Sequence, residues 1–336
     1  MIKLIPRVTT ALMVVALLSV IGCKKLTSEV FPVKVVPKDT TASVKSTVIA
    51  KAALSPSIKT RNVIIIVVDG PRYTETWGDS THQFIPNLYA MRNEGVLLSN
   101  FKNNGYTWTN PGHTAISTGN YESIENSGNQ LPTYPSIFQS FLKSSGQATD
   151  RAWVVTSKEK LNILVNCTNS DWKDKYLPNS DCGPGYRSDD TTYVHTINIM
   201  KKYHPNLMLV NLKDADVGGH INNWKAYLKG IQTTDVQVRG IYDQIQADPI
   251  YKDKTTLIIT NDHGRNTDGV ADGFVSHGCG CDGCRHIEFF AIGPDFKKGV
   301  ALNTPYEQID ISQTVAKLLN FKMEYSKGKV MTELFK

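Results

Sequence analysis

The sequence predicts an α/β fold with a doubly wound, mostly parallel central sheet and helices on both faces. Short apolar runs rich in Val, Ile and Leu recur along the chain, as expected for strands that are buried on both faces. Segments with apolar residues at three- and four-residue spacing alternate with these runs. This alternation begins near residue 61 and continues to the end of the 336-residue chain, which is typical of an α/β domain.

The predicted strands are five apolar runs, and the predicted helices lie between them. The runs that look like buried parallel strands are Asn62–Asp69, Trp153–Thr156, Leu207–Leu212, Leu257–Thr260 and Ile287–Ile292. The helical segments are Asn87–Asn93, Ser136–Ser144, Thr191–Lys202, Trp224–Ala247 and Ile311–Leu319. Ligands bind beyond the carboxyl ends of the strands in such sheets, so the polar residues at those ends are the candidates for a functional site.

The first 22 residues have the features of a secretory signal. Lys3 and Arg7 precede the apolar run Ala11–Ile21, which is too short and wrongly flanked for a comfortable membrane span. The segment ends in Val-Ile-Gly-Cys23, which resembles a bacterial lipobox. We therefore expect a lipoprotein signal peptide at 1–22 and lipidation of Cys23, giving an extracytoplasmic, membrane-anchored bacterial lipoprotein. The alternative is an ordinary signal or anchor with a chance cysteine.

The positive charge of the chain lies outside the predicted folded domain. The chain has a formal net charge of +6. Residues 23–60 contain seven Lys, one Asp and one Glu and show little periodicity, which predicts a flexible tether. Residues 61–336 contain 28 basic and 29 acidic residues. The catalytic domain predicted over 61–336 is therefore nearly neutral, and the sequence does not indicate a nucleic-acid polymer as a partner.

Asp and His residues follow several of the predicted strands. Oxygen and nitrogen donors of these two types can together hold two zinc ions. Any one such segment is more often a turn with a helix-capping Asp, but three of them in register with an α/β pattern favour a metal site. The candidate ligands are Asp69, Asp216, His220, Asp262, His263 and, before the last strand, His277.

A possible nucleophile lies in the segment Thr109-Asn110-Pro111-Gly112-His113. Pro111 favours a helix first turn, and Thr109 stands near the N-cap position. A hydroxyl there lies among free backbone N–H groups at the positive end of the helix dipole, which suits phosphate binding and alkoxide stabilisation. Alternatively, Thr109 merely caps a helix. A nearby metal ion would lower the pKa of the hydroxyl and make it a nucleophile.

The order of these motifs resembles the alkaline phosphatase superfamily, and within it the nucleotide pyrophosphatase/phosphodiesterase branch with its Thr nucleophile. The resemblance spans roughly residues 62–320 and includes the closing helix Asp310–Leu319. It implies two divalent metal ions, usually zinc, and a phospho-Thr intermediate formed on Thr109. It assigns the first ion to Asp69, Thr109, Asp262 and His263, and the second ion to Asp216, His220 and His277.

Some ligand assignments have alternatives close by in the sequence. His286 competes with His277, which we favour because Gly278 follows it and because its distance to Gly293-Pro294 is similar to that in the family. Asp214 competes with Asp216, and only the spacing to His220 favours Asp216.

Other polar residues near the site have both a functional and a structural interpretation. The resemblance implies a phosphate-binding Asn after the nucleophile, for which Asn129 is our choice and Asn126 the competitor. His113 either supports the site or is simply buried. Arg72 and Lys213 either contact an anionic substrate or are exposed surface charges.

Six cysteines are present, and lipidation of Cys23 would leave five. Pairing Cys167 with Cys182 would close a loop of about 15 residues and contribute about 3 kcal/mol. The run Cys279-Gly-Cys281-Asp-Gly-Cys284 can hold a disulfide and a free thiol, or a third metal ion. We favour a disulfide that rigidifies the loop carrying His277, with the odd cysteine unassigned.

These observations predict an extracytoplasmic metal-dependent phosphoesterase, acting as a phosphodiesterase or nucleotide pyrophosphatase on a small phosphoester or nucleotide. A phosphomonoesterase using the same site is the first alternative, and a non-catalytic surface-binding lipoprotein is the second. A sulfatase is disfavoured because Thr109 and His113 stand where those enzymes need Cys or Ser followed by Arg. A cofactor-independent phosphoglycerate mutase is disfavoured because it uses Ser and is cytosolic.

Overall fold

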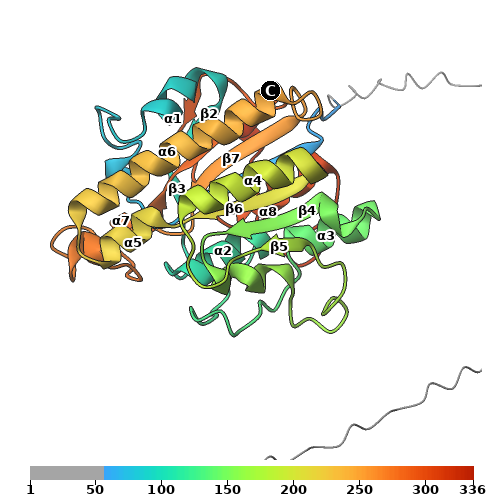
Figure 1. The fold of residues 1–336 in the computed structure, drawn as a ribbon, viewed down its shortest axis with the longest axis horizontal. Helices are drawn as coiled ribbons and strands as arrows, with labels where there is room; N and C mark the ends of the chain where they lie inside the picture. Colours follow the sequence, from blue (N-terminus) through green and yellow to red (C-terminus); the bar gives the residue numbers. More distant parts are fainter. Residues whose placement is uncertain (1–56) are drawn as a thin grey trace, which may run out of the picture. The chain divides into compact units, whose positions relative to one another are not determined.

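A computed structural model describes residues 57–336 of the chain. An eight-stranded sheet forms its centre, in the order β10-β2-β9-β7-β1-β6-β4-β5 (Figure 1). In chain order these strands are β1 (Asn62–Val68), β2 (Val96–Leu98), β4 (Ala152–Thr156), β5 (Asn179–Asp181), β6 (Leu207–Leu212), β7 (Thr255–Asn261), β9 (Phe289–Ile292) and β10 (Val300–Leu302). The predicted α/β class with a mostly parallel sheet is confirmed.

Five neighbouring strands of the sheet, β7-β1-β6-β4-β5, are parallel. β9 differs, because it pairs antiparallel with both β7 and β2. The prediction of a parallel strand over Ile287–Ile292 is therefore wrong. A parallel pairing needs a crossover that returns the chain to the starting edge of the sheet. Between β7 and β9 the longest helix is the four-residue α7 (Asp282–Arg285), which is too short for such a crossover, so β9 runs back in the opposite direction.

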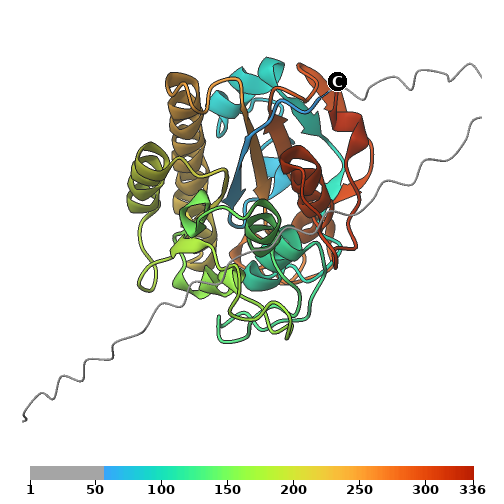
Figure 2. The ribbon, with the colours of Figure 1, turned by 90° about the vertical axis from the view of Figure 1, so that its right-hand side faces the viewer.

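Helices cover both faces of the sheet (Figure 2). The β1 side chains Ile64, Ile66 and Val68 contribute to the core that contains residues of α1 (Pro86–Met91), α4 (Asp189–Tyr203) and α6 (Trp224–Ala247). The alternate β1 side chains belong to the opposite core, beneath α2 (Thr109–Thr118), α3 (Ile137–Ser145) and α8 (Asp310–Leu319). All seven β1 residues are buried, which explains why every position after Asn62 is apolar.

The predicted helices form close to their expected bounds because the sequence contains their caps. Ser136 and Gln139 form a reciprocal capping box at the start of α3. Asn223 accepts the Ala226 N–H at the start of α6. The sequence analysis did not predict the helix α5 (Asp214–His220), whose seven residues include two glycines that weaken the helical pattern.

Short elements complete the described chain and were also not predicted. Two-residue strands carry too little periodicity to be recognised in a sequence. A second sheet has the order β11-β3-β8, formed by β3 (Phe101–Lys102), β8 (His286–Ile287) and β11 (Tyr306–Glu307). The 3₁₀ turns are η1 (Tyr73–Glu75), η2 (Arg92–Glu94), η3 (Thr149–Arg151), η4 (Glu159–Val165), η5 (Gly273–Val275) and η6 (Thr332–Leu334).

The folded domain begins before Arg61, in residues that the sequence analysis assigned to the tether. The Lys59 and Thr60 N–H groups both donate to the Asp295 carboxylate at 2.8 Å. The predicted signal peptide, the lipidation site Cys23 and most of the predicted tether lie outside the described residues. Within residues 57–336, no helix has the length and apolar character needed to cross a membrane.

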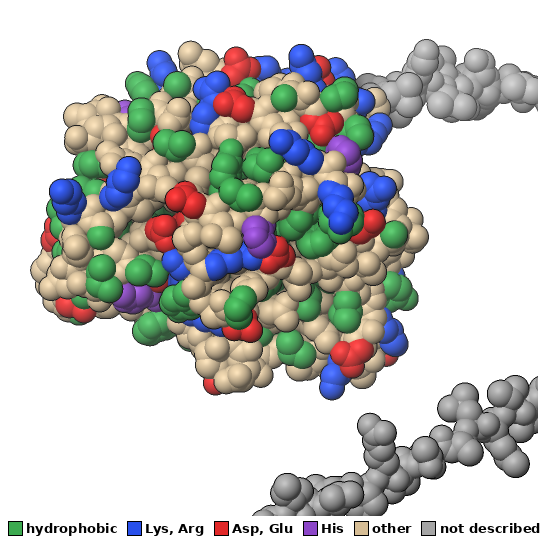
Figure 3. All heavy atoms as spheres, in the orientation of Figure 1, with side chains coloured by type: hydrophobic (Ala, Val, Ile, Leu, Met, Phe, Trp, Pro, Cys, Tyr) green, Lys and Arg blue, Asp and Glu red, His purple; other side chains and the backbone are tan. Residues whose placement is uncertain are grey.

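Cys167 and Cys182 are both free, buried thiols, so the possible bridge between them is not formed. Cys182 directs its sulfur toward the Val154 carbonyl of the neighbouring strand β4, at 3.7 Å, rather than toward Cys167. Basic and acidic side chains are interspersed over the face shown in Figure 3, as expected for a nearly neutral domain.

Candidate metal centre

The carboxyl ends of β1 and β7 bring the first group of candidate ligands together. These strands are neighbours, with Val68 opposite Asn261, so Asp69 and Asp262 leave the sheet side by side. His263 Nε2 lies 3.3 Å from Asp262 Oδ2 and 3.7 Å from Asp69 Oδ1. All three side chains are fully buried. The structure therefore brings these three candidate ligands together.

The atoms that face one another in this group have no hydrogen-bond partner. Asp69 Oδ1, Asp262 Oδ2 and His263 Nε2 are buried and unpaired. His263 Nδ1 lies 2.8 Å from the Gly264 carbonyl, and its N–H donates there, which leaves Nε2 as a bare lone pair. Buried polar atoms are rarely left without partners. Three convergent lone pairs fit a bound cation, and a hydrogen bond from the other ring nitrogen to a backbone carbonyl is typical of a metal-ligating His.

A second group of ligands adjoins the first. Asp216 and His220 lie one turn apart on α5 and point the same way, and His220 Nε2 is 3.3 Å from Asp216 Oδ1. His277, from the loop after η5, places its Nε2 3.1 Å from that of His220 and 3.6 Å from Asp216 Oδ1. The His277 ring stacks on His263 with centroids 3.8 Å apart. The two groups therefore form one continuous donor cluster.

Burial keeps the two stacked imidazoles neutral. It lowers the pKa of His277 to about 4 and, together with the proximity of His277, lowers the pKa of His263 well below its usual value. His277 Nδ1 donates to the Thr107 carbonyl at 2.8 Å, so its Nε2 carries a lone pair, which faces His220 Nε2 at 3.1 Å. Burial and the neighbouring Asp69 raise the pKa of Asp262 to about 6. Neutral imidazoles beside crowded carboxylates are the donor set that divalent ions bind.

Asp189 positions the helix that carries the second group. Its carboxylate accepts the N–H groups of Lys213 and Asp214 at 2.9 and 2.8 Å, which are unsatisfied donors at the start of α5. Ser157 donates to the same carboxylate at 2.6 Å. The N-terminus of α5 is therefore fixed against the end of β4, and this fixes where Asp216 points.

Lys158 is a functional candidate that the sequence analysis missed. Its ammonium lies at the centre of the site, 2.7 Å from Asp216 Oδ2, 2.9 Å from Asp69 Oδ2 and 3.3 Å from Thr109 Oγ1. Although burial alone would lower the pKa of this fully buried lysine, the surrounding carboxylates raise it above its usual value. Lys158 follows β4 by two residues, so the strand-end rule could have found it.

Two further missed residues hold the carboxylates in place. Arg265 is fully buried and donates to Asp216 Oδ1 at 2.5 Å. Asn211, on β6, donates from Nδ2 to Asp69 Oδ2 at 3.0 Å and lies 3.1 Å from His113 Nε2. His113 Nδ1 lies 2.9 Å from the Thr109 carbonyl and 3.4 Å from Asp262 Oδ2. His113 is thus a buried support behind the site, which is one of its two interpretations.

Thr109 is the first residue of α2, with Trp108 as the N-cap. Its side chain is buried. The helix approaches the end of β7 closely through Gly112, where a Cβ atom would lie only 2.4 Å from the Asp262 carbonyl oxygen. Glycine is required at this position because any side chain would push the start of α2 away from Asp262.

Asn126, and not Asn129, lies beside the helix start that carries Thr109. The Asn110 N–H donates to Asn126 Oδ1 at 2.9 Å. The Asn129 side chain is exposed and donates instead to Ser127 Oγ at 2.9 Å. The structure therefore does not bring our preferred Asn129 to the site. The segment from Asn126 to Asn129 turns so that Asn129 contacts Ser127. The number of residues after Thr109 does not reveal this turn.

The remaining alternatives lie away from the donor cluster. His286 stacks on Tyr73 with centroids 3.9 Å apart and lies 3.0 Å from the Ser99 carbonyl. Asp214 pairs with Lys213 at 2.7 Å. Arg72 pairs with Glu75 and Asp268. Among the residues compared, the structure places His277 and Asp216 in the cluster, as we favoured, and it engages Arg72 and Lys213 in ion pairs.

A cavity of about 440 Å³ opens onto the donor cluster and Thr109. Lys158 and Lys160 line it together with Asn126, and the partly exposed Trp108 and Tyr186 also line it. Burial and the nearby Lys158 lower the pKa of Lys160 to about 8. The cavity thus combines cations, a hydroxyl and aromatic surface.

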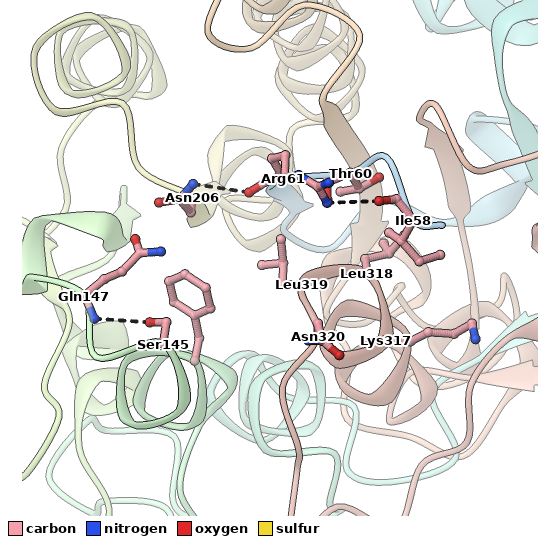
Figure 4. A pocket seen from close by; sticks show the side chains of 11 residues that line it. Ile58, Thr60, Arg61, Ser145, Gln147, Asn206, Lys317, Leu318, Leu319 and Asn320 are labelled. Carbon is pink, nitrogen blue, oxygen red and sulfur yellow. Dashed lines mark hydrogen bonds between the residues drawn. The ribbon is translucent and has the colours of Figure 1, made fainter. Parts of the chain in front are cut away.

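A second cavity of about 450 Å³ lies at the opposite edge of the sheet (Figure 4). Arg61, which precedes β1, and Asn206, which precedes β6, line it together with residues near the end of α8. Arg61 and Lys317 are its only ionisable lining residues, so it offers no acidic or imidazole donor. We therefore assign the functional site to the carboxyl edge.

Similar proteins agree with this architecture. A phosphopentomutase of Clostridium novyi (strain NT) is 34% identical over 127 residues, which are 37% of this chain and 29% of the relative. The chain thus matches less than a third of that curated relative's length. A phosphonate monoester hydrolase from Silicibacter pomeroyi shares 15% identity, with a TM-score of 0.60 and coverage of 82% of this chain and 76% of that one.

Two other solved structures show the same fold. An alkaline phosphatase superfamily protein from Vibrio parahaemolyticus is 14% identical, with a TM-score of 0.62 over 84% of this chain and 75% of that one. Murine ectonucleotide pyrophosphatase/phosphodiesterase 5 is 14% identical, with a TM-score of 0.57 over 82% of this chain and 100% of that one. A sequence model described as the Metalloenzyme superfamily matches residues 61–323. The fold expected from the resemblance to the alkaline phosphatase superfamily is thereby confirmed, and the chain belongs to the Metalloenzyme superfamily.

Proposed function

We propose that this protein is a metal-dependent phosphoesterase that cleaves phosphodiester or nucleotide pyrophosphate bonds through a phospho-Thr intermediate. The observation that carries the proposal is the convergence of three Asp and three His side chains in one donor cluster, which meets a cavity lined by the hydroxyl residue Thr109. The unpaired lone pairs of Asp69, Asp262 and His263 support a cation in the first group. The names of the similar proteins, which include phosphoester hydrolases, support the same reaction class.

The residues of the chain have separate parts in this reaction. Thr109 Oγ1 attacks phosphorus, the bond to the leaving group breaks, and a phospho-Thr ester forms. Water then attacks that ester and regenerates Thr109. Lys158 donates toward Thr109 Oγ1 and is protonated, so it stabilises the alkoxide and the phosphoryl charge rather than acting as a base. Asn126 and the first turn of α2 border the phosphoryl position.

The donor set suits two divalent ions, and we propose zinc because mixed His and Asp ligation is typical of it. One ion would be held by Asp69, Asp262, His263 and Thr109. The other would be held by Asp216, His220 and His277. Bound there, the ions would supply Lewis acidity that lowers the pKa of the hydroxyl and of water and neutralises charge on the phosphoryl group.

A phosphomonoesterase is the second candidate, because the cavity contains two lysines. Lys160 lies on the wall of the cavity, with its Nζ 3.2 Å from the Asn126 carbonyl. A second cation suits either the dianionic group of a monoester or the additional phosphate of a nucleotide pyrophosphate. A monoester carries both negative charges on the reacting phosphoryl group. A nucleotide pyrophosphate carries one on the reacting phosphoryl group and another on the phosphate of the leaving group.

The test combines metal analysis with three substrates. We expect purified protein to contain two zinc ions per chain at the Asp/His cluster. We also expect it to cleave bis-p-nitrophenyl phosphate and a nucleotide p-nitrophenyl ester faster than p-nitrophenyl phosphate. A strong preference for p-nitrophenyl phosphate would replace the diesterase proposal with the monoesterase. Protein that takes up no divalent metal and cleaves none of the three would instead be a surface-binding lipoprotein.

We propose in addition that the domain is anchored outside the cytoplasm through lipid on Cys23. The signal-like residues 1–22 and the Lys-rich segment up to residue 60 support this location. Mass spectrometry of the mature N-terminus should find a diacylglyceryl-modified Cys23, and Cys23→Ser should release the protein into the soluble fraction. An unmodified N-terminus elsewhere would contradict the proposal.

A further inference from the structure

Three cysteine sulfurs converge in the loop between η5 and β8, outside the Asp/His cluster. The sulfurs of Cys279, Cys281 and Cys284 all lie within 4.8 Å of one another. The structure joins Cys279 to Cys281 as a disulfide, which bears out our preference for a disulfide in this loop. The free sulfur of Cys284 lies 3.2 Å from that of Cys279. A disulfide uses two of the three sulfurs, whereas a metal ion would use all three.

Backbone N–H groups point at two of the three sulfurs, whereas burial raises the pKa of the third, the Cys284 thiol. The Cys281 N–H donates to Cys279 Sγ at 3.2 Å, and the Thr267 N–H donates to Cys281 Sγ at 3.4 Å. Hydrogen bonds to the charged form of a group favour that form, and such bonds to ligating atoms are typical of metal sites. Arg285 adds a positive charge in the same loop, with Nε 3.2 Å from the Gly280 carbonyl.

We propose that the three cysteines in their thiol form, before the Cys279–Cys281 disulfide is made, bind one thiophilic metal ion, Zn²⁺ or Cu⁺, separate from the ions of the Asp/His cluster. Thiolate ligands select these two ions over hard cations. Binding forms three metal–sulfur bonds and releases three thiol protons to solvent. Cys284 donates to Asn266 Oδ1 at 3.2 Å. Loss of the thiol proton frees this oxygen, which lies nearby for the fourth position that tetrahedral zinc requires.

The position of the cluster suggests what the ion does. Cys279 follows His277 by two residues, and its carbonyl accepts the Thr107 hydroxyl at 2.9 Å. The Gly264 N–H, next to His263, donates to the Cys284 carbonyl at 2.9 Å. The cysteine loop therefore contacts the segments on which His263 and His277 lie. An ion bound there would hold both ligands of the catalytic site in place.

The test uses cobalt as a spectroscopic probe on the full chain, reduced with a phosphine and freed of metal. Cobalt bound to thiolates gives a charge-transfer absorption that Asp and His ligands do not give. We expect this absorption to saturate at one Co²⁺ per chain. Cys284→Ser should abolish it and lower the total metal content by one ion. Metal analysis of protein purified under reducing conditions then separates the zinc arm from the copper arm.

Matched variants keep the result unambiguous. Cys167→Ser removes a buried thiol outside the cluster and should retain the absorption. Cys281→Ser, at a partly exposed position, replaces Cys284→Ser if that chain does not fold. Reduced protein without the absorption, or Cys284→Ser and Cys281→Ser chains that keep it, would overturn the proposal. Because the readout does not need activity, a Thr109→Ala chain should behave as the parent does, whether or not the proposed function is correct.

Discussion

The two edges of the central sheet both carry a cavity, but only one carries reactive chemistry. The cavities have similar volumes, about 440 Å³ at the carboxyl edge and about 450 Å³ at the amino edge. At the amino edge, Arg61 and Asn206 donate to the backbone carbonyls of Ile58 and Arg61 at 2.9 and 3.2 Å. At the carboxyl edge, the buried ligand atoms of Asp69, Asp262 and His263 have no hydrogen-bond partner. Unpaired ligand atoms, and not the volume of the cavity, therefore distinguish the metal centre from the cavity at the amino edge.

Of the variants that test this difference between the two edges, Thr109→Ala should have the largest effect on activity. Because we propose that the hydroxyl forms the covalent intermediate, its removal should lower kcat on a phosphodiester by about 10³-fold or more. Metal content should fall little, since Asp69, Asp262 and His263 remain. Steady-state kinetics with metal analysis of the same sample checks this. Thr109→Ser is the matched control and should keep a measurable part of the rate. A Thr109→Ala chain with near-normal kcat would show that water attacks phosphorus directly.

Lys158→Met should have the next largest effect. Loss of the ammonium beside Thr109 should lower kcat by about 10²-fold, as loss of a charge-stabilising donor does in other enzymes. It should also destabilise the metal-free protein by about 3–5 kcal/mol, because Asp69 and Asp216 lose their shared buried cation. Urea unfolding with and without zinc checks the second part. The loss should be smaller with zinc bound, and an equal loss in both states would contradict the role of Lys158 between the two carboxylates.

Much of the fold could be predicted because its signals are local. The apolar strands β1 and β6 and the helix α6 occur at or within one residue of their expected bounds. The orientation of β9 was not predictable from its composition, because direction depends on how the preceding loop returns to the sheet. The two-residue strands β3, β8 and β11 are defined only by their partners.

The site was predicted where residue type and strand end coincide. Asp69, Asp262 and His263 follow strands directly, and the sequence grouped them correctly. Asn126 was not preferred because its position depends on how its loop folds. Lys158 was missed because a lysine after a strand usually points to solvent. Its burial is caused by carboxylates from two other segments, and no single segment reveals such a neighbour.

A smaller effect should come from Lys160, through pH. Its pKa of about 8 means that the ammonium is charged at pH 7 and largely neutral at pH 9. The KM for a phosphoester should therefore rise about tenfold over that interval, which corresponds to about 1.4 kcal/mol. Lys160→Arg should remove this rise, because guanidinium stays charged. Lys160→Met should give a high KM at every pH. A rise that persists unchanged in both variants would assign the titration to another group.

The smallest effect should come from Lys317→Ala, at the amino-edge cavity. Lys317 is solvent-exposed and near the end of α8, and it makes no ion pair among the described residues. Its removal should change stability by less than about 0.5 kcal/mol, as is usual for surface substitutions. It should leave kcat, KM and metal content unchanged, because Lys317 and the metal centre lie at opposite ends of the parallel strands. Kinetics and metal analysis should be carried out on Lys317→Ala and Lys160→Met side by side. The pair compares the loss of one lysine at the amino-edge cavity with the loss of one at the carboxyl-edge cavity. A comparable change in KM from both variants would mean that the two edges are coupled. The assignment of function to the carboxyl edge alone would then fail.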